Sequence, residues 1–350
     1  MVWERLGSAS VGGSVANNSW KELGRQTLSS SGDVMTTGTI TAKDNMMILY
    51  YGVASGEMIN KLTFNDDTGN NYAYRLSDGG ATDSTTTSNA FLEFATSSTS
   101  NEFSVANVVN IANQEKLVQL NHVGQNTVGA GTVPRRRELT GKWANTSNAI
   151  TKVTATNSQS GSFGSGSELI VLGYDNDEAD TGSNFWQELA SVTRTDSGST
   201  LESGNFAAKK YLMVEACTIP ANNGFKGRLE FGHSNGTMDT GSNYTDRYEQ
   251  DGGSDSTNAS HQYIYAYTNH DDNIQHLKMF IVNKSDKEKL VLWWASSGGS
   301  STGAGNAPQR RNGVAKWTNT SNQITNIRLN NQVAGGDAAS GSFIKVYGAD

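Results

Sequence analysis

The chain has 350 residues, a formal net charge of −7 and a hydrophobic fraction of only 35%. Its 7 Trp, 12 Tyr and 11 Phe exclude a disordered chain, which lacks aromatic residues and carries dense charge. Three prolines exclude collagen, and no apolar run approaches the ~20 residues that a membrane-spanning helix needs. The negative charge argues against nucleic acid as a partner, because phosphate binding needs a positive surface.

The chain begins with an N-terminal extension, residues 1–19, in which no basic region precedes an apolar stretch. We therefore expect no secretory signal and no membrane insertion. The single cysteine, Cys217, has no partner for an intramolecular disulfide and lies in an apolar run. Both features are typical of a protein that folds in a reducing cytosol.

From residue 20 onward the sequence contains an internal repeat of two similar copies. WKEL, EKLV, KWANTSNAIT and GSELIVLGYD return in the same order as WQEL, EKLV, KWTNTSNQIT and GSFIKVYGAD. Because the spacing between the matched segments hardly drifts, the copies differ only by small loop insertions. The repeat predicts two homologous domains, 20–175 and 186–350, joined by an acidic linker at 176–185.

Each copy is predicted to be a β-sandwich. The apolar residues alternate with a period of two, and MMILYYGV (46–53) and YLMVEACTI (211–219) are continuous enough to be central strands. Eight or nine short apolar runs per copy, separated by Ser, Thr, Asn, Gly and Asp, are typical of an antiparallel sandwich. The predicted fold class is all-β, with two tandem antiparallel β-sandwich domains of jelly-roll-like type.

One strand differs informatively between the copies, because FLEFA in the first aligns with YIYAY in the second. The alternation puts Leu92 and Ile264 in the core and the intervening residues outside. It therefore predicts an outward ladder of three tyrosines: Tyr263, Tyr265 and Tyr267. Subunit packing, stacking on a sugar ring and ordinary cross-strand pairing under a loop all remain open for this ladder.

A cluster of arginines also recurs, as PRRR and then PQRR, and is expected just outside a strand. Such arginines belong either to a solvated loop or to a subunit contact, where the guanidinium group forms bidentate salt bridges. The candidate subunit-contact residues are Arg135, Arg136, Arg137, Arg310 and Arg311.

The remaining polar motifs indicate structure more than chemistry. DTGNNY and DTGSNY place Asp67 and Asp239 two residues before a glycine, which is typical of a turn whose aspartate accepts hydrogen bonds from nearby amides. A calcium site, which needs six to eight oxygens, is the alternative. The match to G-x-S-x-G at 299–303 lacks the helix that a nucleophile elbow requires. Apart from the calcium alternative, we expect no metal, no cofactor, no catalytic residue and no enzyme.

The opening W-(K/Q)-E-L, the AAKKYLMVE strand at 207–215 and the closing GSFIKVYGAD resemble β-sandwich domains in structural proteins of tailed bacteriophages. Such domains occur in head decoration proteins, head fibres and tail fibres. The first copy departs from the pattern, with TAKDNMMIL at 41–49. The resemblance implies a virion component that assembles in the host cytoplasm. It also implies homo-oligomers, often trimers, and contact with other virion proteins such as the major capsid protein.

These observations favour a non-enzymatic virion surface protein, either a capsid decoration protein, a fibre or a tail-associated component. Two alternatives stay open. One is a carbohydrate-binding module that recognises a host-surface glycan through Tyr263, Tyr265 and Tyr267. The other is a tandem jelly-roll major capsid protein.

Overall fold

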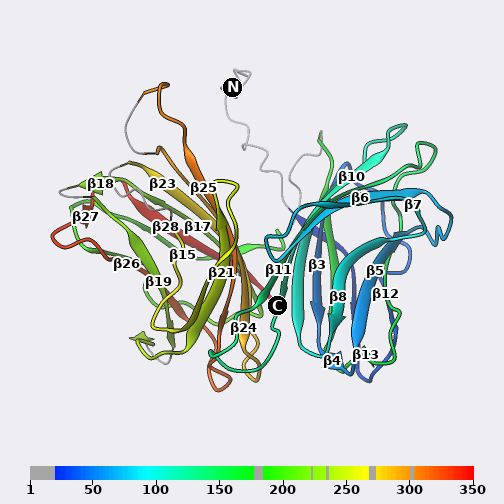
Figure 1. The fold of residues 1–350 in the computed structure, drawn as a ribbon, viewed down its shortest axis with the longest axis horizontal. Coiled ribbons are helices and arrows are strands. Elements are labelled where there is room, and N and C mark those ends of the chain that lie inside the picture. The colour runs from blue at the N-terminus through cyan, green and yellow to red at the C-terminus, as the bar shows by residue number, and fades with distance from the viewer. Residues whose placement is uncertain (1–19, 177–183, 222–223, 234–235, 268–272, 300–302) are drawn as a thin grey trace, which may run out of the picture.

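The structure is a computed structural model that describes residues 20–176, 184–221, 224–233, 236–267, 273–299 and 303–350. The expected N-terminal extension and most of the expected linker lie outside these residues. The described residues form strands and turns, and among them no helix is long and apolar enough to cross a membrane. They build two tandem antiparallel β-sandwich domains (Figure 1), which confirms the predicted fold class.

Domain 1 packs a large sheet of eight strands against a sheet of four, with a two-stranded sheet at one end. In spatial order the large sheet contains β1 (Lys21–Thr27), β14 (Glu168–Tyr174), β3 (Asn45–Gly52), β9 (Glu102–Val109), β10 (Lys116–Gly124), β11 (Arg135–Trp143), β6 (Tyr72–Asp78) and β7 (Ser84–Asn89). The small sheet contains β2 (Val34–Thr36), β12 (Val153–Asn157), β5 (Met58–Phe64) and β8 (Leu92–Ser98), and the pair is β13 (Ser162–Phe163) with β4 (Ala54–Ser55).

Domain 2 repeats this arrangement strand for strand in its large sheet. That sheet contains β15 (Gln187–Thr193), β28 (Phe343–Ala349), β17 (Tyr211–Thr218), β23 (Gln275–Val282), β24 (Lys289–Ser297), β25 (Gln309–Trp317), β21 (Tyr244–Gln250) and β22 (Ser256–His261). The small sheet contains β16 (Thr200–Glu202), β26 (Asn326–Asn331), β19 (Gly227–His233) and β20 (Thr237–Met238), and the pair is β18 (Pro220–Ala221) with β27 (Asp337–Ala338).

Both continuous apolar runs are central strands, as predicted. β3 lies between β14 and β9, and β17 lies between β28 and β23. Alternate residues of β3, such as Ile48, point into the core of domain 1, where β5 and β12 of the small sheet cover them. The residues between them, such as Leu49, are also buried, but in a second cluster that includes residues of domain 2. The run is continuous because both faces of the strand are covered.

The two domains differ at the edge of the small sheet. In domain 1, β8 pairs with β5 and buries Leu92 and Phe94. In domain 2 the matched segment, 263–267, forms no regular strand. It pairs with β19 only through an isolated antiparallel β-bridge between Ile264 and Leu229. Ile264 and Ala266 are buried, as the alternation predicted. The alternation then stops, because the residue after Ala266 is buried as well.

Candidate functional site: the face shared by the two domains

The large sheets of the two domains pack against each other, so the molecule has a third apolar core between the domains. We call the side of each large sheet that points away from its own small sheet its outer face. Domain 1 contributes directly paired cross-strand neighbours to this core, among them Ile170, Leu49 and Val105. Domain 2 contributes Tyr211, Val282 and others, all buried. Because these apolar side chains are removed from water, the contact between the two large sheets is stabilising and holds the domains together.

The contact uses opposite ends of the two equivalent faces. Half A of an outer face is the end at which β3 or β17 finishes, and half B is the end at which that strand begins. Domain 1 buries half A, with Tyr51 and Leu49, whereas domain 2 buries half B, with Tyr211 and Val282. The interface is therefore heterologous: a given patch meets a different patch, not its own copy. Half B of domain 1 and half A of domain 2 are left uncovered by this contact.

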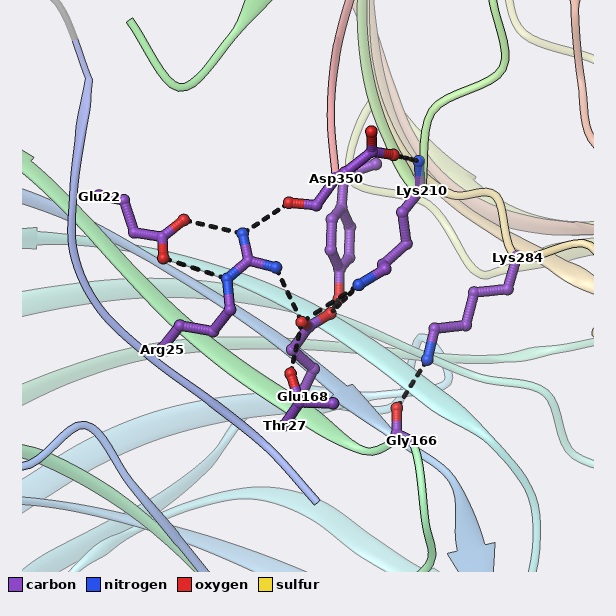
Figure 2. Close-up of polar contacts among 9 residues, drawn as sticks. Glu22, Arg25, Thr27, Gly166, Glu168, Lys210, Lys284 and Asp350 are labelled. Carbon is purple, nitrogen blue, oxygen red and sulfur yellow. Dashed lines mark hydrogen bonds and ion pairs between the residues drawn. The ribbon is translucent and has the colours of Figure 1, made fainter. Parts of the chain in front are cut away.

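A buried carboxylate ties the two faces together (Figure 2). Glu168, at the start of β14, has a fully buried side chain and accepts hydrogen bonds from Tyr211 Oη at 2.6 Å and from Thr27 Oγ1 at 2.8 Å. Arg25 of domain 1 and Lys210 of domain 2 form ion pairs with it at 2.8 and 3.2 Å. Burial alone would raise the pKa of Glu168, but these hydrogen bonds and cations bring that pKa below its usual value.

Further polar contacts surround the apolar core. Arg136 pairs with Asp255 of domain 2 at 2.6 Å, and each side chain is only 4% exposed. Glu288 of domain 2 accepts hydrogen bonds from Gln125 Nε2 at 2.7 Å and from the backbone N–H of Gly129 at 2.6 Å. Buried, charge-assisted contacts of this kind fix one relative orientation of the two surfaces.

The five predicted arginines lie within strands β11 and β25 and not just outside a strand, so that expectation is wrong. Three of them, Arg136, Arg137 and Arg311, are buried within the chain. Arg311 lies over the ring of Tyr248, at 4.1 Å from its centroid. Arg135 and Arg310 keep 40% and 55% of their side chains exposed and pair with acidic neighbours. A subunit contact by these two exposed arginines stays a prediction.

The predicted tyrosine ladder is wrong for its third member. Tyr267 is only 1% exposed and packs into the core of domain 2, because no regular strand carries the alternation past Ala266. Tyr263 and Tyr265 are partly exposed, and their hydroxyl groups lie 3.0 Å apart. Arg228 lies over the ring of Tyr263. The structure therefore brings two of the three tyrosines together at the surface.

The two matched aspartates, Asp67 and Asp239, lie in turns, and each accepts a hydrogen bond from a buried tryptophan. Asp67 accepts hydrogen bonds from the backbone N–H of Gly69 at 2.9 Å and from Trp143 Nε1 at 2.6 Å. Asp239 accepts the same pair from Gly241 at 2.9 Å and from Trp317 at 2.7 Å. Among the described residues, no three His, Cys, Asp or Glu side chains are grouped so that they could hold a metal ion. The carboxylates are thus used by the turn and by the indole.

One buried histidine belongs to domain 1 alone. His122 Nδ1 lies 2.9 Å from Ser104 Oγ, and the ring is 1% exposed. Burial, with a smaller contribution from Arg137 and Arg135, lowers the pKa of His122 to about 3. The ring is therefore neutral at physiological pH. The matched position in domain 2 is Ala295, so the two copies share neither this histidine nor its hydrogen bond.

Comparison with known proteins adds little to this description. No family model and no curated protein matches the chain. Among solved structures, domains LG4-5 of the mouse laminin α1 chain align over 98% of this chain and 92% of their own length, at 9% identity and a TM-score of 0.19. Neisserial surface protein A aligns over 83% of this chain and 99% of its own length, at 5% identity and a TM-score of 0.14. Neither similarity is close enough to support a function.

Proposed function

We propose that this chain is a non-enzymatic structural protein of a virus particle, a decoration, fibre or tail-associated component that assembles with copies of itself on the virion surface. The observation that carries the proposal is that buried charged side chains hold the two domains in one orientation. Glu168 and Arg136 both form buried contacts between the two domains. This is the chemistry of a rigid building block, and the bacteriophage-like segments of the sequence agree with it.

Contacts between copies would use what the domain interface leaves free. Arg135 and Arg310 are exposed enough to exchange their intrachain acidic partners for those of a neighbouring copy. Assembly would take place in the host cytoplasm, and the major capsid protein is the expected partner on the particle.

The proposal is tested in two steps on the full chain. Native mass measurement should find a homo-oligomer, with a trimer as the expected state. The purified protein should then co-sediment with capsids that were assembled without it, and electron microscopy should show added density on the capsid surface. A strict monomer that leaves the capsids undecorated would overturn the proposal.

A further inference from the structure

The outer face of domain 1 carries a long depression where domain 2 does not cover it. Three adjoining grooves, of about 450, 380 and 320 Å³, lie there. The first and second share Gln119 and Thr140 in their walls, and the second and third share Glu138 and Arg310. They therefore form one trench that crosses the strands from β14 to β6. Five strand spacings of about 4.8 Å give it a length of roughly 24 Å.

Aromatic rings stand at two places along the trench. At one end the rings of Trp20 and Tyr174 meet edge to face at a centroid distance of 4.7 Å. Further along, Trp294 of domain 2 lines the wall and is held edge to face against Phe280 at 6.0 Å. Trp20, Tyr174 and Trp294 are partly exposed, and their ring contacts fix their orientation. Such rings provide contact area at a small cost in conformational entropy.

Between the rings the floor combines neutral polar side chains with two exposed apolar ones, Val109 and Leu117. Asn107, Gln119 and Thr140 are exposed along neighbouring strands of the same sheet. The matched positions of domain 2 are Phe280, Leu292 and Val314, and these are buried in the domain interface. At these three positions the covered sheet is apolar and the trench carries an amide or a hydroxyl, whereas the exposed Val109 and Leu117 of the trench match the buried Val282 and Leu290. The trench thus repeats only part of the protein-covered patch and replaces one cross-strand row of it with polar side chains.

The charges of the trench cancel. No charged side chain lines the end with Trp20. The other two grooves contain three cations and three anions, and each cation has an anion beside it: Arg75 with Asp83 at 3.7 Å, Arg136 with Glu138 at 2.7 Å and Arg310 with Glu249 at 3.2 Å. A face without net charge offers no attraction to a polyanion or a polycation.

From these features we propose that the trench binds an extended, uncharged oligosaccharide laid across the strands of domain 1. The tryptophan faces would pack on the apolar C–H faces of sugar rings, and Asn107, Gln119 and Thr140 would exchange hydrogen bonds with the sugar hydroxyl groups. Both domains line the trench, so the locked domain interface is a condition for binding. The inference goes beyond the proposed virion role and does not depend on it.

The test uses the full chain and titrates linear neutral hexasaccharides of β-1,4-glucan, α-1,4-glucan and β-1,4-mannan, with tryptophan fluorescence and calorimetry as readouts. At least one should bind, with an affinity that 0.5 M NaCl does not change. Gln119→Ala removes an exposed amide and should weaken binding about tenfold without altering the melting temperature. Trp294→Ala should weaken it at least as much. The control is His276→Ala, on the uncovered half A of domain 2, which should bind like the original protein.

Three results would overturn the inference. They are failure of all three hexasaccharides to bind at millimolar concentration, binding that Gln119→Ala leaves unchanged, and preferential binding of heparin that salt abolishes. Because Gln119 is exposed, a folding defect does not obscure that variant if Trp294→Ala proves unstable. Capsid association is measured separately, so either proposal can fail while the other stands.

Discussion

Half A of the outer face is apolar in domain 1 and charged in domain 2. In domain 1 a row of direct cross-strand neighbours contains Ile170, Leu49 and Val105, and this row is buried against domain 2. The same row of domain 2 contains Lys345, Glu215 and Lys278, and it is left partly exposed. Lys278 and Glu215 lie 3.5 Å apart in that row.

This difference shows how a duplicated domain avoids open-ended assembly. A heterologous contact that does not close into a ring can repeat without limit, with half A of one domain meeting half B of the next. Charges on half A of domain 2 make that next step costly, because they would lose their water. Glu168 has also been replaced, by Phe343, so the acceptor for Tyr211 is missing there. The contact within the chain is therefore favoured over its repetition between chains.

The largest expected effect comes from placing the domain 2 residue in the domain 1 row. Leu49→Glu buries a carboxylate without a cation against domain 2, and should cost about 4 kcal/mol of unfolding free energy. We expect calorimetry to resolve two domain transitions where the original protein gives one. The matched control is Glu215→Leu, at the same position of the uncovered face. It should change stability by less than about 1 kcal/mol, and equal losses in the two variants would contradict the comparison.

The next effect concerns the buried carboxylate itself. Glu168→Gln keeps the shape of the side chain but leaves Arg25 and Lys210 without their shared anion, at a cost of about 3 kcal/mol. Because the folded pKa of Glu168 is below its usual value, its contribution is present above pH 4.5 and is lost as the pH falls through the folded pKa. Urea unfolding at pH 7 and pH 3 should show a smaller acid loss for the variant than for the original protein.

The control for that experiment is Glu22→Gln. Glu22 also pairs with Arg25 at 2.8 Å, but its side chain is 37% exposed. Its loss should cost no more than about 1 kcal/mol. A Glu22→Gln variant as unstable as Glu168→Gln would mean that burial of the carboxylate between the domains does not matter.

The turn aspartates make the same contacts in both domains, so their removal should destabilise the two domains equally. Asp67→Ala and Asp239→Ala each remove a charged acceptor from a tryptophan N–H and a turn amide, and each should cost about 2 kcal/mol by urea unfolding. Adding 5 mM calcium should leave the melting temperature of the original protein unchanged. A calcium-dependent rise that either variant abolishes would instead support the calcium alternative.

The sequence predicts the fold of each domain better than it predicts what lies between them. The repeat and the run at 46–53 correctly predict two sandwiches with a central strand, since these signals are local. The pairing of Arg136 with Asp255 has no local signal, because the partners are 119 residues apart and belong to different copies. The alignment of the copies did contain one signal of the domain interface: Leu49 in the first copy aligns with Glu215 in the second. Local alternation failed at Tyr267, where the strand it assumes does not form.

The smallest effect should be an acid sensitivity confined to domain 1. The folded pKa of His122 is about 3 and its unfolded value is about 6.5, so between these values the unfolded chain binds a proton that the folded domain excludes. Stability should therefore fall as the pH drops below 6.5, by about 1 kcal/mol at pH 5.5 relative to pH 7. His122→Gln keeps a hydrogen-bonding group beside Ser104 and should remove that part of the loss, whereas His276→Gln, an exposed histidine of domain 2, should not. If His122→Gln and the original protein lost stability equally over this range, the buried ring would not be the group that titrates.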